Sequence, residues 1–182
     1  MRDMTQQNMI NAFGGESMAH MRYLIFAERA AHEDLPNVTR LFRAIAAAEL
    51  IHAGDHYRVL RHLDGGFAAN SMGTFGPGET GKNLALAVAG ESFEVQEMYP
   101  AFMKVAELQD ETEAYRSFLW SYETEKMHLA LFRKAQEAVA SKRDVELGPV
   151  AVCAICGYTL EGEAPDECPV CKAKKDKFKV FD

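Results

Sequence analysis

The chain has 182 residues, of which 48% are hydrophobic and 26% charged, the composition of a globular protein with one full domain and a small second module. Its formal net charge of −7 argues against nucleic acid or an anionic membrane surface as a partner. No apolar run approaches the roughly 20 residues that a membrane helix needs, and residues 1–8 lack the apolar segment of a signal peptide. We therefore expect a cytoplasmic protein.

Helical periodicity dominates the start of the chain. Residues 4–33 and 38–63 carry apolar side chains at helical spacing, and Pro36 with Asn37 between them marks a turn and a helix start. Within the first stretch we expect an apolar core stripe made of Met18, Met21, Leu24 and Ile25.

Two more helices are predicted after a long connection. Residues 64–81 contain six glycines and Pro77, which excludes a regular element there. Residues 82–108 are again helical, with a kink expected near Pro100. Asp110 and Glu113 resemble a capping box that opens a fourth helix ending near residue 141. The sequence thus predicts a mainly α protein, a ferritin-like four-helix bundle with one long crossover between its second and third helices.

The end of the chain has a different character. Residues 142–150 read as a short polar linker after a bundle over residues 1–141. Residues 151–182 form a module too small to build a core without a metal, and we expect short strands and turns there.

The four cysteines of the chain all lie in this last module. They form two Cys-x-x-Cys pairs, Cys153 with Cys156 and Cys168 with Cys171, separated by eleven residues. Each pair points two sulfurs at one place, so two facing pairs make a tetrahedral four-thiolate metal site. Two disulfides would instead require an oxidising compartment. A zinc ribbon is the other alternative, although its pairs are typically about 15–20 residues apart.

Each predicted bundle helix offers a glutamate in an apolar setting. The second helix carries Glu49-x-x-His52 and the fourth carries Glu125-x-x-His128, and residues three apart on a helix can reach one metal. The first and third helices add Glu16 and Glu91. One Glu-x-x-His is often only a solvated face, but this complete set is the ligand set of di-iron carboxylate bundles. Carboxylates with one imidazole per metal suit iron or manganese better than zinc.

The third helix departs from the general pattern at Glu94, three residues after Glu91. This side chain is either a surface residue, like nearby Glu97, or a further carboxylate that joins and leaves one metal as its oxidation state changes.

The bundle, Glu91-x-x-Glu94 and the final Cys-x-x-Cys-Gly-Tyr … Cys-Pro-x-Cys segment together resemble the rubrerythrin family over essentially the whole chain. The resemblance implies a di-iron centre, oxo-bridged when oxidised, and a rubredoxin-like iron held by four cysteines. The residues that match the di-iron ligands are Glu16, Glu49, His52, Glu91, Glu94, Glu125 and His128. Those that match the rubredoxin ligands are Cys153, Cys156, Cys168 and Cys171. It also implies catalytic roles for four residues: Glu94 and His52, which would exchange at one iron, and Tyr23 and Tyr99, which would lie beside the site.

The same resemblance implies a peroxidase that reduces hydrogen peroxide to water in oxidative-stress defence. The rubredoxin-like iron would relay electrons from an external donor, such as a rubredoxin or a nicotinamide-linked reductase, because the chain has no nicotinamide or flavin site of its own. A homodimer is implied in which the module faces the partner's bundle, although the linker is long enough to reach its own. His20 and His56 each lie one turn from a predicted ligand and are read as neighbours of the site or as surface residues.

Two rival functions are iron oxidation and storage, as in ferritins, and pure electron transfer or oxygen sensing. Storage needs no inbound electron relay, so Glu94 and the attached module favour the peroxidase.

Overall fold

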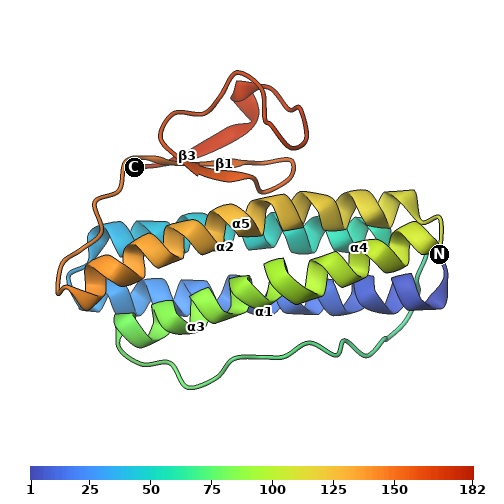
Figure 1. Cartoon of the computed structure of the whole chain (residues 1–182), viewed down its shortest axis with the longest axis horizontal. Coiled ribbons are helices and arrows are strands. Elements are labelled where there is room, and N and C mark those ends of the chain that lie inside the picture. Colours follow the sequence, from blue (N-terminus) through green and yellow to red (C-terminus); the bar gives the residue numbers. More distant parts are fainter.

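The predicted bundle is present, with four helical segments packed side by side (Figure 1). The structure, a computed structural model, describes residues 1–182. The segments are α1 (Asp3–His32), α2 (Pro36–Val59), a third formed by α3 (Thr80–Phe93), the π-helix η1 (Glu94–Met98) and α4 (Tyr99–Leu108), and finally α5 (Thr112–Ala140). The crossover between α2 and α3 runs along the outside of the bundle, past α1 and α3 (Figure 1). The ferritin-like prediction is therefore confirmed.

Two hydrophobic clusters fill the bundle. One is built around Tyr23, Phe42 and Phe132, and the other around Met9 and Phe118. Along α1, α2 and α5, buried polar residues separate the positions that belong to the two clusters. Apolar burial therefore holds the helices together on both sides of a polar layer.

The expected apolar stripe of α1 belongs to the core only at Leu24, which packs against the cluster around Tyr23. Met21 and Ile25 are 54% and 49% exposed, and with Met18 they line a hollow of about 370 Å³ that Phe75 and Pro77 of the crossover also line. These three residues face the crossover, and the neighbouring face of α1 carries the bulkier core residues, Tyr23 and Phe26 among them.

Two local predictions on the second half of the bundle need correction. The capping box is wrong, because Asp110 has a left-handed φ of 59°, α5 begins at Thr112 and its N-cap, Glu111, makes no side-chain cap hydrogen bond. The irregularity expected at Pro100 is the π-helix just before it, and such π turns are frequent at functional sites.

The cysteine module is a small antiparallel sheet. Its strands are β1 (Val150–Cys153), β2 (Thr159–Glu161) and β3 (Phe178–Phe181), in the order β2-β1-β3, with the 3₁₀ turn η2 (Lys175–Lys177) before β3. Because β1 begins at Val150, the predicted boundary at residue 151 lies one residue inside the strand, and the domain division stays a prediction.

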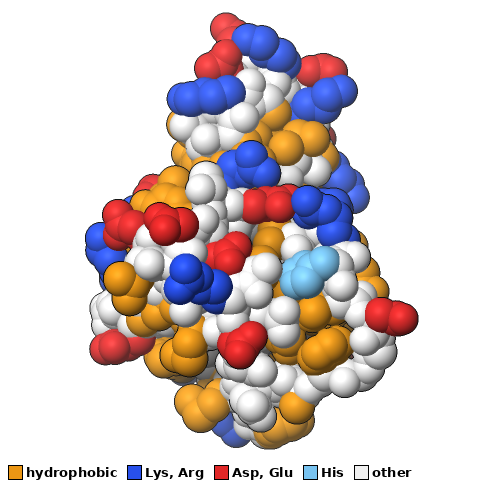
Figure 2. Space-filling view, turned by 90° about the vertical axis from the view of Figure 1, so that its right-hand side faces the viewer, with side chains coloured by type: hydrophobic (Ala, Val, Ile, Leu, Met, Phe, Trp, Pro, Cys, Tyr) orange, Lys and Arg blue, Asp and Glu red, His pale blue; other side chains and the backbone are white.

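The module is docked on α2 and α5 of its own bundle (Figure 1). Val150 and Val152 pack against Ala44 and Ala48, and Lys134 makes a 2.7 Å ion pair with Glu161 at the rim. Figure 2 shows the module as a lobe standing on the bundle, with charged side chains gathered at its outer end. This intramolecular docking differs from the arrangement implied by the resemblance, in which the module faces a partner's bundle.

None of the helices combines the length and the apolar character that a membrane span needs.

Candidate metal centres

The four cysteine sulfurs converge at one end of the module. Cys153 Sγ lies 3.6 Å from Cys171 Sγ, and Cys156 Sγ lies 3.7 Å from Cys168 Sγ. A tetrahedron with metal–sulfur bonds of about 2.3 Å has edges of about 3.8 Å. None of the four is in a disulfide, whose sulfurs would be about 2.05 Å apart. The cage therefore fits one metal ion.

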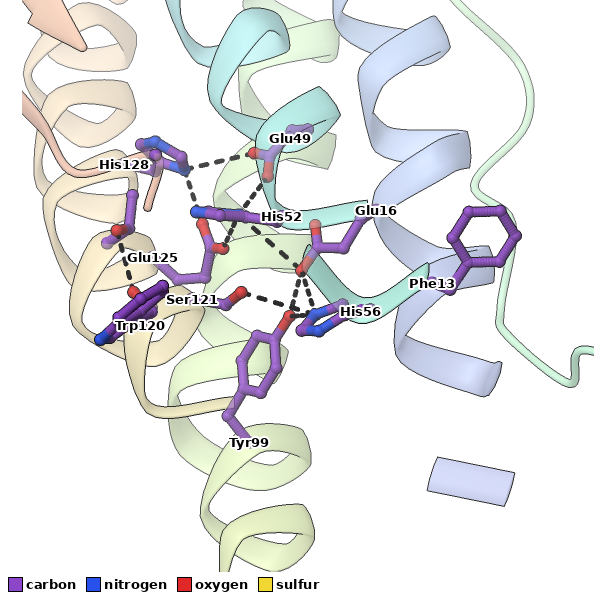
Figure 3. A network of polar contacts seen from close by, with 12 residues as sticks. Phe13, Glu16, Glu49, His52, His56, Tyr99, Trp120, Ser121, Glu125 and His128 are labelled. Atoms are coloured by element: carbon purple, nitrogen blue, oxygen red, sulfur yellow. Dashed lines mark hydrogen bonds and ion pairs between the residues drawn. The ribbon is translucent and has the colours of Figure 1, made fainter. Parts of the chain in front are cut away.

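Inside the bundle, two groups of buried side chains converge, and in each the ligand atoms lie within 4.8 Å of one another. Figure 3 labels all of these residues except Glu91. The first group is Glu16, Glu49, His52 and Glu125, and the second is Glu49, Glu91, Glu125 and His128. Each group has its own glutamate and histidine, and the two share Glu49 and Glu125. Two shared carboxylates are the arrangement needed to bridge a pair of metal ions.

Unpaired buried atoms support a fit to metal ions. Glu125 Oε1 and Oε2, Glu49 Oε1, Glu91 Oε2 and His128 Nδ1 are buried and make no hydrogen bond of good geometry, although the nitrogens of His52 and His128 lie within ion-pair distance of Glu125. Leaving such groups unpaired in an apolar interior is costly. Two divalent cations would offset four carboxylate charges, and the donor set of oxygens and one imidazole per ion suits iron.

The ionisation of these groups reflects their crowding. Burial, followed by repulsion from other carboxylates, raises the pKa of Glu16 and Glu91 well above the usual range. Burial would also raise the pKa of Glu125, but His52 and His128 outweigh it and lower that pKa. For His128, burial favours the neutral ring, but Glu125 and Glu49 prevail and raise its pKa to about 9. The protein alone therefore cannot charge all its carboxylates, and protons occupy places that cations would take.

Both histidines of these groups join the bundle site to the cysteine module. His52 directs Nδ1 to Glu125 and Glu49, at 2.8 and 3.0 Å, and its other ring nitrogen lies against Gly157. His128 directs Nδ1 to Glu125 at 2.6 Å, and its Nε2 lies 3.1 Å from Thr159 Oγ1. Gly157 follows Cys156 directly, so the two rings span the gap between the two candidate centres.

Every predicted ligand falls into one of the three groups except Glu94. That half-buried side chain lines a pocket of about 490 Å³ with Arg22, Phe93 and Met98, between α1, the crossover and the α3–α4 segment. Burial, followed by repulsion from Glu125 and Glu49, raises the pKa of Glu94 well above its usual range. The structure thus groups His52 with the carboxylates and leaves Glu94 facing the pocket.

The two predicted tyrosines each hold one glutamate of the site. Tyr23 Oη donates to Glu91 Oε1 at 2.6 Å, and Tyr99 Oη donates to Glu16 Oε1 (Figure 3). Burial, then the charge of the bonded glutamate, raises the pKa of each tyrosine, so both hydroxyls keep their protons at neutral pH.

His56 lies beside the bundle site, whereas His20 lies away from it. His56 is fully buried beside the site, between Ser117 and Tyr99, and burial together with His52 lowers its pKa to about 3. His20 is half-buried, and its Nδ1 lies 2.6 Å from the carbonyl oxygen of Ala46, away from the candidate ligands.

Sequence reasoning did not single out Gly157, Thr159 or Ser117. Gly157 is part of the Cys-x-x-Cys-Gly-Tyr segment, but its positive φ of 80° and its contact with His52 become visible only in the fold. Thr159 and Ser117 carry no signal in the sequence, because a hydroxyl on a strand or helix is usually unremarkable.

The chain matches two family models. Residues 7–136 match the model described as rubrerythrin, and residues 152–179 match the rubredoxin-like domain of rubrerythrin.

Individual relatives agree over nearly the whole length. The chain is 43% identical to rubrerythrin-2 of Clostridium acetobutylicum, over 98% of this chain and 97% of the relative. It is 31% identical to nigerythrin of Nitratidesulfovibrio vulgaris, over 97% of this chain and 86% of the relative. The solved structure of fully reduced, all-ferrous nigerythrin aligns with a TM-score of 0.84, over the same shares of the two chains.

With a carboxylate–histidine site suited to two irons, a four-cysteine site after it and matching models for both parts, this chain belongs to the rubrerythrin family.

Proposed function

We propose that the chain is a peroxidase that reduces hydrogen peroxide to water, with electrons entering through the four-cysteine iron. The observation that carries the proposal is the contact of the module with both bundle histidines, at Gly157 and Thr159. An electron inlet that contacts one histidine of each ligand group is useful to a site reduced repeatedly, and iron storage has no need of one.

The proposed ligands follow the geometry. Two irons would be held by Glu16, Glu49, His52, Glu91, Glu125 and His128, and a single iron by Cys153, Cys156, Cys168 and Cys171. Glu94 would be the carboxylate that exchanges with His52 at one of the two irons. When bound, two ferrous ions would supply the two electrons that cleavage of the O–O bond of peroxide requires.

Peroxide would approach from the side opposite the module. The pocket of about 490 Å³ that borders Glu94 lies between α1, the crossover and α3–α4, whereas the module covers α2 and α5 (Figure 1). The raised pKa of Glu94 favours its protonated form, so this carboxyl could hold a proton next to an incoming peroxide. Arg22 in the same pocket counters the charge of Glu94 once the proton has left.

Two tyrosines and a threonine hold candidate ligands in position. Tyr23 and Tyr99 fix one oxygen each of Glu91 and Glu16, which limits their rotation as the charge of the site changes. Thr159 Oγ donates to the carbonyl oxygen of Gly157 at 2.8 Å, and it therefore accepts from His128 Nε2–H. That bond leaves His128 Nδ1 free to bind metal.

The electron donor is external in this proposal, for example a rubredoxin or a nicotinamide-linked reductase. Cys171 is only partly buried, and charged side chains surround the outer end of the module, which supports docking of a protein there (Figure 2). A cytoplasmic homodimer is part of the same proposal.

The test is stopped-flow oxidation of the anaerobically reduced protein by hydrogen peroxide, with iron counted per chain. We expect three irons per chain and a fast two-electron step with peroxide that is much slower with oxygen. Slow reaction with peroxide together with mineralisation of many irons per chain would favour the storage function instead.

A matched control separates chemistry from electron supply. Protein with zinc in the cysteine site and iron in the bundle should complete one turnover as fast as the all-iron protein. It should fail in repeated turnover with a reductase, because zinc carries no electron.

A further inference from the structure

A continuous line of hydrogen bonds leads away from the bundle site on the side of α5. Ser117 Oγ lies 2.8 Å from His56 Nδ1, and His56 Nε2 lies 3.0 Å from Tyr99 Oη. Tyr99 Oη in turn donates to Glu16 Oε1, one of the candidate ligands (Figure 3). The histidine, the tyrosine and the glutamate are at most 1% exposed, so no water competes for these bonds.

The donors of these hydrogen bonds all point the same way along the line. The single proton of Tyr99 is donated to Glu16, so the tyrosine oxygen must accept from His56 Nε2–H. His56 is fully buried, which favours the neutral ring, and its Nδ1 therefore accepts from the hydroxyl of Ser117. Each donor thus points inward, from Ser117 toward Glu16.

The outer end of the line opens to solvent. Ser117 is 4% exposed and lines a pocket of about 540 Å³ between the bundle and the module. Asp55 and Trp120 line the same pocket, with Ala154 and Ile155 of the first Cys-x-x-Cys turn. Water in this pocket can reach the serine hydroxyl without passing the peroxide pocket on the opposite side.

We propose that Ser117, His56 and Tyr99 form a proton relay that carries a proton from this pocket to Glu16 at the bundle site. The proposal rests on the proposed peroxidase function, because reduction of peroxide consumes protons: H₂O₂ + 2 H⁺ + 2 e⁻ gives 2 H₂O. The electrons come from the external donor through the module, and the relay supplies one of the two protons.

One passage of the relay moves four protons by one bond each. A water of the pocket gives a proton to Ser117 Oγ, which passes its own to His56 Nδ1. His56 passes its Nε2 proton to Tyr99 Oη, and the tyrosine passes its own to Glu16 Oε1. Ser117, His56 and Tyr99 each end with one proton, Glu16 gains the proton that the pocket water loses, and solvent neutralises the hydroxide left behind. Before the next turnover the proton of His56 has to return from Nδ1 to Nε2, and the two hydroxyls have to turn back.

The test compares two serines on the same helix. Ser117→Ala removes the entrance of the relay, whereas Ser121→Ala removes a hydroxyl 3.5 Å from His56 that lies outside the line. Positioned proton transfer contributes roughly 10²–10⁴-fold to a reaction. We expect Ser117→Ala to slow peroxide reduction by about 100-fold, the low end of that range, and to enlarge the rate ratio between H₂O and D₂O. Ser121→Ala should change neither, and Ser117→Thr should restore the rate.

A second readout does not depend on activity. Nitrogen NMR of histidine-labelled protein loaded with zinc should show His56 with its proton on Nε2 and a hydrogen-bonded, unprotonated Nδ1. In Ser117→Ala the Nδ1 signal should lose that hydrogen bond. Melting temperatures of all variants identify any that fail to fold.

The outcomes separate the relay from the proposed function. A proton on Nδ1 of His56, or equal rates and equal isotope effects in the two alanine variants, would overturn the relay. If wild-type protein does not reduce peroxide at all, the proposed function fails, and the NMR result still decides whether the line has the inferred direction.

Discussion

Gly157 is the residue at which the module and the bundle meet most closely, and Gly157→Ala tests that contact. A Cβ at this position would lie 2.4 Å from His52 Nε2 and 2.7 Å from His52 Cδ2. Non-bonded heavy atoms are normally about 3.5–4.0 Å apart, so the module would have to retreat by about 1 Å. Movement of the ring instead would break the contacts of its Nδ1 with Glu125 and Glu49.

The loss of stability expected for Gly157→Ala has two causes. The φ of 80° is left-handed, which costs an L-residue about 1–2 kcal/mol. Overpacking at a close contact costs about 1–3 kcal/mol more. We expect Gly157→Ala to destabilise the docked module by about 2–5 kcal/mol in total. The retreat would also slow re-reduction of the bundle irons, because the rate of electron transfer falls with distance.

Gly162→Ala is the matched control. Gly162 also has a positive φ, 105°, but a Cβ there meets nothing within 4 Å. This variant carries the backbone cost of about 1–2 kcal/mol without the clash. The assay is stopped-flow absorbance of the cysteine-bound iron after peroxide, together with denaturant unfolding. If both variants lose the same stability and re-reduce at the same rate, the contact between Gly157 and His52 does not exist in solution.

Three further predictions follow from the site. Thr159→Val should lower the affinity of the His128 group for ferrous ion by about 10–100-fold while Thr159→Ser keeps it, as measured by anaerobic titration; equal affinities would contradict the role of the hydroxyl. Emptying only the bundle site should make stability fall as the pH rises from 6.5 to 9. The reason is that the pKa of His128 is raised from 6.5 to about 9, so the stabilisation by its protonated ring is complete below pH 6.5 and is lost as the pH rises through 9. The raised pKa of Glu16 and Glu91 also makes the protein less stable as the pH rises. The lowered pKa of His56 has the opposite effect on stability, but only below pH 6.5. Thermal melts over this pH range, with and without ferrous ion, are the measurement, and the melting temperature should depend less on pH when metal replaces the protons. Finally, two inactive variants can be refolded together: one lacks two module cysteines (Cys168→Ser and Cys171→Ser), and the other lacks two bundle ligands (Glu125→Ala and His128→Ala). If electrons pass within one chain, the mixture should not regain repeated turnover. Recovery would show that they pass between chains.

The bundle and its ligand groups could be predicted because their determinants are local. Glu49-x-x-His52 and Glu125-x-x-His128 need only helical periodicity to put two side chains on one face, and the two Cys-x-x-Cys turns carry their geometry in their spacing. The prediction that the apolar stripe of α1 lies in the core was wrong for most of its residues, for a related reason. Periodicity marks an apolar face, but it does not say whether helices or the crossover will cover it, and Met21 and Ile25 lie under the crossover.

Contacts between distant segments could not be predicted. Ser117 and His56 are 61 residues apart, and His128 and Thr159 lie on different parts of the fold. Their hydrogen bonds depend on how α2, α5 and the module pack, which no local pattern specifies. The position of Glu94 was equally beyond the sequence, because its spacing from Glu91 is the same whether the side chain joins the ligand groups or faces the pocket.

The docking of the module and the binding of metal in the bundle are energetically linked. The rings of His52 and His128 offer Nδ1 to the carboxylates and their opposite edges to Gly157 and Thr159, so one orientation satisfies both sides. Metal that fixes the rings must stabilise docking, and docking must raise metal affinity by the same factor, since coupling between two binding equilibria is reciprocal. The glycine at the contact is therefore more than a permissive residue. It lets the cysteine module approach closely enough to take part in shaping the bundle site.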